Sequence, residues 1–109
     1  MEKIIPHNLV AEQSVLGSMF LSKYALQKCI EGLTSDQFYS DAHSKIFHVI
    51  SELAENGSPI DLTTVTAELD KRKELKQIGG VEYLSEIASL VPTAANVDEY
   101  IKIVEEKQS

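Results

Sequence analysis

Few side chains in this sequence combine the residue type and the spacing that metal binding requires. His48 and Glu52 stand four residues apart, so on a helix they share one face and could supply two ligands to a metal ion. Two ligands without a third make a weak site. The pattern therefore favours an ion pair on an exposed helix surface, and we assign no metal ligands.

Histidine could also serve as a general base, and His43 is the residue to consider. By its helical position it falls among the apolar residues of a helix, and no nucleophile stands near it in the sequence. We therefore expect His43 to be a core histidine that is satisfied by a hydrogen bond to a neighbour. We assign no catalytic residues. A small helical hydrolase using His43 or His48 with nearby carboxylates remains the enzymatic alternative, which metal analysis and a nucleotide-hydrolysis assay would test.

Two stretches resemble parts of a phosphate site without forming one. Gly79-Gly80 precedes a helix, but Glu82 follows directly and no lysine completes a phosphate-binding loop. We expect a structural hinge there. The basic run Lys71-Arg72-Lys73 is typical of a solvated helix end near the negative pole of the helix dipole. We therefore expect no cofactor in this chain.

Composition narrows the class of protein further. A chain of 109 residues with 43% apolar residues is one globular domain. Its 17 acidic and 10 basic residues give a net charge of −7, which repels a nucleic-acid backbone. The single cysteine, Cys29, has the spacing of a buried helix residue, as expected in a reducing compartment. We find no signal peptide or membrane-spanning stretch, and we expect a cytoplasmic protein.

The stretch from Ser40 to Gly57 has the clearest secondary-structure pattern in the chain. Its apolar residues recur at steps of three and four, which predicts a helix with one broad apolar face. Ser40 is a good N-cap, and Asn56-Gly57 is a good stop. We expect an all-α, compact orthogonal domain of about six helices arranged around this central helix, residues 41–56.

Helix start and stop signals divide the rest of the chain into shorter helices. Gly17, in the middle of the first of them, indicates that another helix comes close there. The expected elements are a helix from Asn8 to about Leu21, a Ser22-capped helix closed by Gly32, a turn with a capping box at 34–37, an Asp61-capped helix, a helix after Gly79-Gly80 stopped by Pro92, and a last helix opened by a capping box at 96–99.

Several separated motifs resemble one family. The opening signature Pro6-His7-Asn8-Leu9-Val10-Ala11-Glu12-Gln13-Ser14-Val15-Leu16-Gly17 resembles that of bacterial replicative DNA helicases of the DnaB family. Further matches, in order and with compatible spacing, are Asp36-Gln37-Phe38-Tyr39 with His43, Ile46 and Phe47, then Gly57 to Leu62, Ile78 to Leu84, and Pro92 to Asn96.

The resemblance implies the amino-terminal domain of such a helicase. In the family this helical head is followed by a helical hairpin, a linker and a RecA-like motor that uses ATP and magnesium to unwind DNA. We accordingly expect a tail at 1–7, a head at 8–96 and, at 97–109, the start of a hairpin whose sequence continues beyond Ser109. The implied partners are other copies in a hexameric collar, the primase, and a helicase loader.

The resemblance also suggests primase contacts at Tyr83 and Glu12. Tyr83 stands one residue off the apolar stripe of its helix, where it is either a stripe-edge core residue or an interface anchor. Glu12 stands early in the first helix, where a carboxylate has an ordinary structural role as well. The rival binding module is the helicase-binding domain of a primase, which has a similar fold but lacks the Ala11 to Gly17 signature.

Overall fold

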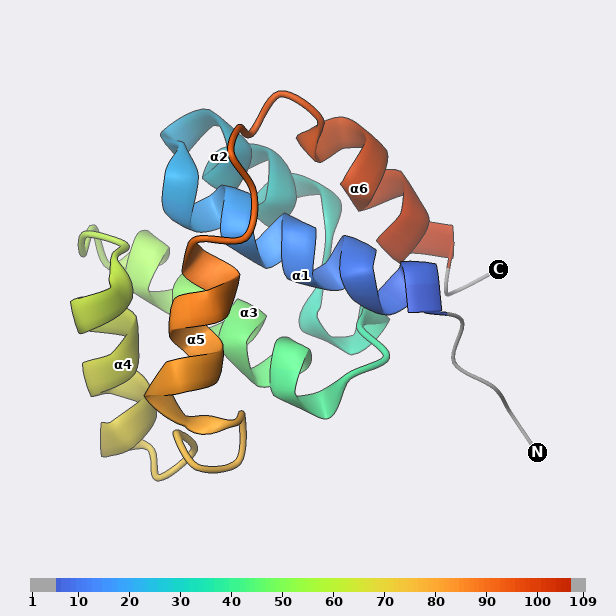
Figure 1. The fold of residues 1–109 in the computed structure, drawn as a ribbon. Helices are drawn as coiled ribbons and strands as arrows, with labels where there is room; N and C mark the ends of the chain where they lie inside the picture. The colour runs from blue at the N-terminus through green and yellow to red at the C-terminus, as the bar shows by residue number, and fades with distance from the viewer. Residues whose placement is uncertain (1–5, 107–109) are drawn as a thin grey trace.

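The computed structural model describes residues 6–106, and in this range it contains helices and no strand. The elements are α1 (Pro6–Leu21), α2 (Lys23–Gly32), a 3-10 turn η1 (Ser35–Gln37), α3 (Asp41–Glu55), α4 (Leu62–Lys71), α5 (Gly80–Ala88) and α6 (Val97–Glu105), as Figure 1 shows. The prediction of an all-α domain with about six helices is confirmed.

The first helix begins earlier than we expected. α1 starts at Pro6 and not after Asn8. Proline suits the first position of a helix because its fixed φ matches the helix and its missing N–H is not needed there. Residues 1–5 of the tail expected at 1–7 lie outside the described range, as do residues 107–109. The start of a hairpin expected at 97–109 stays a prediction.

Most of the expected caps form. Ser22 Oγ accepts a hydrogen bond from Ala25 N at 3.0 Å, and Ser40 Oγ accepts one from His43 N at 3.3 Å. Asp61 accepts one from Thr64 N at 2.9 Å. The capping box at 34–37 is present, and Gly57 after α3 has a φ of +76°. Short polar side chains therefore set where these elements begin, as the sequence indicates.

The capping box expected at 96–99 is wrong. Asn96 has φ −98° and ψ 16°, and its side chain makes no capping hydrogen bond. An N-cap side chain reaches the first turn from an extended backbone, which Asn96 does not have. Its backbone carbonyl oxygen instead accepts from Glu99 N at 3.0 Å and from Tyr100 N at 3.3 Å.

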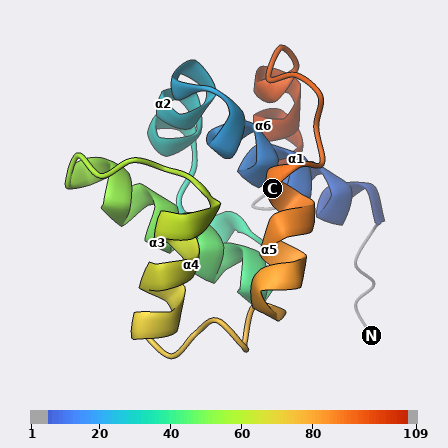
Figure 2. The ribbon, with the colours of Figure 1, turned by 60° about the vertical axis from the view of Figure 1, so that its left-hand side comes forward.

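The centre of the domain is α1, which corrects the expected arrangement around residues 41–56. α1 packs against α2, α3, α5 and α6, whereas α3 packs against α1, α4 and η1 (Figures 1 and 2). Both helices contribute fully buried side chains, including Leu16 and Met19 from α1 and Ile46 and Ile50 from α3. The apolar face of α3 is as broad as predicted, but α1 is covered on more sides.

Gly17 lets α5 approach α1 closely, as its position in the sequence indicated. A Cβ atom added at Gly17 would lie 2.7 Å from the backbone carbonyl oxygen of Ile87 and 3.5 Å from Val91. No side chain fits at that distance from a backbone atom. The contact holds the last turn of α5 against α1.

Candidate functional site

A chain of hydrogen bonds joins three helices in the interior of the domain. Glu12 comes from α1, His43 from the first turn of α3, and Tyr83 from the first turn of α5. His43 Nδ1 lies 2.8 Å from Glu12 Oε1, and His43 Nε2 lies 2.6 Å from the Tyr83 hydroxyl oxygen. Gln13 Nε2 donates to the same hydroxyl oxygen at 3.0 Å. We call these four residues the Glu12–Tyr83 network.

The carboxylate of Glu12 anchors the network. It is only 1% exposed, and it accepts hydrogen bonds from the backbone N–H groups of Tyr39, at 2.6 Å, and Ser40, at 3.3 Å. A buried carboxylate is tolerated when several donors satisfy it. Glu12 therefore fixes the segment that leads into α3 as well as the His43 ring.

One proton arrangement satisfies every member of the network. His43 donates from Nδ1 to Glu12 and accepts at Nε2 from the Tyr83 hydroxyl, whose oxygen accepts from Gln13. The Tyr83 ring also lies nearly parallel to the His43 ring, with centroids 5.9 Å apart and an angle of 8°. Tyr83 is half-buried, so the network holds a partly exposed aromatic ring in one orientation.

The expectation for His43 is confirmed, because the ring is 2% exposed and hydrogen-bonded at both nitrogens. The expectation of a direct partner contact by Glu12 needs correction, since a carboxylate this deeply buried does not reach a partner. The sequence contained a signal for this burial. Glu12 follows Leu9 by three residues and precedes Leu16 by four, and so lies on the apolar face of α1.

The sequence did not indicate which of these polar side chains contact one another. Glu12 and His43 are 31 residues apart, and His43 and Tyr83 are 40 residues apart. The role of Gln13 as a donor to Tyr83 was also missed. No periodicity within one helix indicates which polar side chains of different helices meet.

The order carboxylate, imidazole, hydroxyl is also that of a catalytic triad, and the geometry decides against this chemistry. The hydroxyl belongs to a tyrosine whose oxygen already contacts His43 and Gln13. A nucleophile must face a bound substrate together with donors that stabilise the developing charge. Four hollows of the described surface are each lined by other residues. The network is built to fix a side chain in place.

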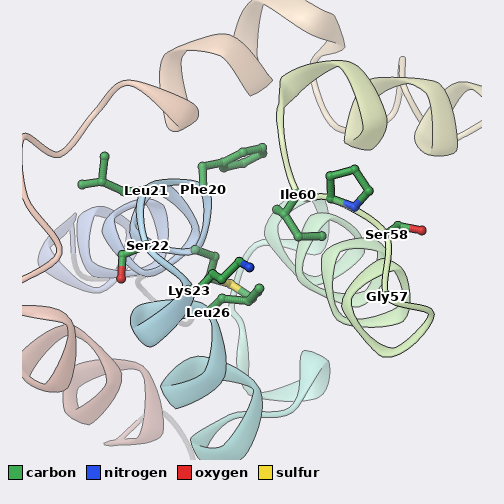
Figure 3. Close-up of a pocket in the computed structure, with 10 residues that line it drawn as sticks. Phe20, Leu21, Ser22, Lys23, Leu26, Gly57, Ser58 and Ile60 are labelled. Carbon is green, nitrogen blue, oxygen red and sulfur yellow. The ribbon is translucent and has the colours of Figure 1, made fainter.

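One of these hollows, of about 490 Å³, lies between the α1–α2 corner and the loop from α3 to α4. Phe20, Leu21 and Leu26 line one side, and Gly57 and Ile60 lie across from them (Figure 3). The lining is largely apolar and includes Lys23 (Figure 3). It does not include any residue of the Glu12–Tyr83 network.

The remaining charged residues considered as candidates, His48 and Arg72, form ion pairs. His48 Nε2 lies 3.2 Å from Glu52, as expected for a surface pair, and the guanidinium of Arg72 binds Glu52 and Glu68. The hydrogen bond from Arg72 and the nearby His48 lower the pKa of Glu52. Within residues 6–106, no group of three or more potential ligands is placed to hold a metal ion. Arg72, at the C-terminal end of α4, therefore also joins α4 to α3.

Cys29 is a buried thiol, as predicted. It is fully buried in the core, and burial, with a smaller contribution from Asp98, raises its pKa to about 12. A thiol that stays protonated at neutral pH is a poor nucleophile. Among the described helices, none has the length and apolar character to cross a membrane.

The fold and the sequence place this chain in a known class of domain. The family model described as "DnaB-like helicase N terminal domain" matches residues 4–106, and the chain belongs to this family. The resemblance noted from the sequence motifs is therefore confirmed.

Individual relatives agree with this assignment. The chain is 54% identical over 106 residues to the replicative DNA helicase DnaB of Geobacillus stearothermophilus and 47% identical over 106 residues to the replicative DNA helicase DnaC of Bacillus subtilis, in each case covering 97% of this chain. It spans only 23% of the length of either relative.

A solved structure shows the same fold. The N-terminal domain of DnaB helicase from Mycobacterium tuberculosis superposes with a TM-score of 0.86 at 49% identity, over 91% of this chain and 72% of that one.

Proposed function

We propose that this chain acts as the amino-terminal, protein-binding domain of a replicative DNA helicase. The family match and relatives named as replicative helicases support the proposal. ATP and magnesium would bind in a separate motor domain of the parent protein, which hydrolyses ATP and unwinds DNA in the cytoplasm. The chain itself contributes no catalytic residue in this proposal, in agreement with a hydrogen-bond network that fixes side chains.

The proposed partners are proteins. The domain would support assembly of a hexameric collar, dock the primase and receive a helicase loader. It would not bind DNA directly, because a net charge of −7 opposes contact with phosphates. An acidic domain of this kind can hold partner proteins near a motor without competing for the DNA.

The observation that carries the primase proposal is the fixed, half-buried ring of Tyr83. Aromatic anchors in interfaces bind best when their rotamer is already selected, because no side-chain entropy is then lost on binding. The ring is oriented by His43, which is in turn oriented by Glu12. In this proposal Tyr83 contacts the primase, and Glu12 acts indirectly as a positioning residue.

Primase binding by the full-length helicase tests the proposal. We expect Tyr83→Ala to weaken binding about tenfold or more, as for loss of an interface anchor. Tyr24→Ala, which truncates a tyrosine that is 62% exposed and distant in sequence, is the matched control and should have no effect. Glu12→Gln should weaken binding less than Tyr83→Ala. If Tyr83→Ala binds primase as the wild type does, or if Tyr24→Ala weakens binding equally, the docking role of Tyr83 is wrong.

The two rival interpretations receive less support. A primase domain would be expected to match primases, whereas the relatives found here are named as helicases. A helical hydrolase would need substrate access to His43 or His48. His43 is 2% exposed and bonded at both nitrogens, and His48 pairs with Glu52. Metal analysis and a nucleotide-hydrolysis assay on this chain should both be negative.

A further inference from the structure

Helices α4 and α5 lie side by side (Figures 1 and 2). A groove runs along the surface that they share. It consists of two shallow hollows of about 480 and 460 Å³, which share Leu62 and Val81 and are therefore continuous. We call this the α4–α5 groove. Leu62, Asp70 and Leu75 line it on one side, and Val81, Glu86 and Ser89 line it on the other.

The groove offers apolar surface that the domain leaves uncovered. Val81 is 47% exposed although it is a large aliphatic residue in the first turn of α5, and Leu62 and Leu75 are only partly buried. Small side chains, Ala67 and Ser85, line the groove next to them. Small residues beside large apolar ones allow another helix to approach closely, with its side chains between the larger ones.

The charge of the groove is of one sign. Asp70, Glu82 and Glu86 line it, and no lysine or arginine does so. The ion pairs found among residues 6–106 engage other carboxylates, such as those of Glu52 and Glu68, and none of these three. Three exposed carboxylates beside apolar side chains are complementary to a surface that carries cations around an apolar stripe.

We propose that the α4–α5 groove binds a basic amphipathic helix of a partner protein. A helix suits the groove better than an extended segment, because the walls are helices whose backbone groups are already paired and cannot extend a sheet. The apolar stripe of the partner contacts Leu62, Leu75 and Val81, and its lysines or arginines face the carboxylates. The same face of a second copy is the less suitable occupant, since it would bring its own Asp70, Glu82 and Glu86 against those of the first.

This site is distinct from the Glu12–Tyr83 network. The Tyr83 hydroxyl bonds to α1 and α3, whereas Val81, Ser85 and Ser89 of the same region line the groove. The groove proposal and the primase proposal can fail independently.

Fluorescence anisotropy with a synthetic peptide tests the proposal on this chain. The probe is a fluorescein-labelled peptide of roughly 18 residues, with leucines on one helical face and lysines on the other. The paired variant Asp70→Lys with Glu86→Lys should weaken binding at least tenfold. Both positions lie near the C-terminal ends of their helices, where lysine is compatible with the helix dipole, so the fold should be retained. Circular dichroism checks that it is.

The matched control reverses the same number of charges elsewhere. Glu31 and Glu55 are exposed and also lie near helix C-termini, in α2 and α3. Glu31→Lys with Glu55→Lys should change peptide affinity less than twofold. A peptide of the same composition in scrambled order, and one with glutamate in place of lysine, should bind at least tenfold more weakly than the probe.

Four results would each overturn the proposal. They are no binding of the probe by the wild type, an equal loss in both charge-reversal pairs, equal affinity for the scrambled peptide, and wild-type self-association in sedimentation that Asp70→Lys with Glu86→Lys abolishes. The second would mean attraction by net charge alone, and the last would identify a second copy as the occupant. Val81→Ser, with the charges intact, should also weaken binding of the probe about threefold or more if the apolar contact is real.

Discussion

Removal of the Glu12 side chain is the most direct test of the buried network. In the wild type this carboxylate accepts hydrogen bonds from Tyr39 N, Ser40 N and His43 Nδ1. Glu12→Ala leaves all three donors without their acceptor. Each unpaired buried donor costs about 1–3 kcal/mol, and water can reach those nearest the surface, so we take the lower values. The expected loss in the free energy of unfolding is about 3–5 kcal/mol.

A loss of this size is a large share of the stability of a small domain, which is about 5–15 kcal/mol. Urea denaturation followed by circular dichroism measures it, because the midpoint shifts in proportion to the lost stability when the slope stays constant. Glu12→Gln should cost about 1–3 kcal/mol, since the amide keeps one acceptor but turns a donor toward another donor. Glu105→Ala, at an exposed position, is the control and should change stability by about 0.5 kcal/mol or less.

The connection between Glu12 and Tyr83 can be measured separately from the stability of either side chain. In a double-mutant cycle of Glu12→Gln and Tyr83→Phe, we expect a coupling energy of about 0.5–2 kcal/mol, transmitted through His43. A loss below about 1 kcal/mol for Glu12→Ala would refute our account of the anchor. Strict additivity in the cycle would refute the coupling.

Three other predictions follow from the packing and the titratable groups. Gly17→Ala should destabilise the domain by about 1–2 kcal/mol in urea denaturation, because the new Cβ meets the Ile87 carbonyl oxygen at 2.7 Å and the cost of overpacking exceeds the gain in helix propensity. Unchanged or increased stability would contradict the close contact. With its pKa raised to about 12 by burial, Cys29 should react with Ellman's reagent at pH 8 about a hundredfold more slowly in the native protein than in urea. Equal rates would show that the thiol is accessible. The pKa of Glu52 is lowered by its hydrogen bond to Arg72. This ion pair therefore stabilises the folded state at a pH above the unfolded pKa of Glu52, about 4.5. The stabilisation is lost as the pH falls through the lower pKa of the folded state. Glu52→Gln should therefore remove part of the acid-side pH dependence of the melting temperature, and an unchanged pH profile would argue against the pair.

Much of the secondary structure was predictable because its causes are local. Ser22, Ser40 and Asp61 cap the helices that follow them, since a short polar side chain needs only the backbone three residues ahead. Asn96 is the exception, because capping also depends on the backbone angles that the preceding loop imposes. The sequence therefore predicts where most helices start and fails where a loop conformation decides.

By itself, the sequence determined the helical class, the acidic surface, the buried character of His43 and Cys29, and the need for close helix packing at Gly17. Each of these follows from composition or from the spacing of residues along one helix. Only the tertiary structure decided that α1 is the most enclosed helix and that Glu12, His43 and Tyr83 meet. The reason is physical: periodicity specifies which face of a helix is buried, but the partner of that face depends on how all the helices pack together.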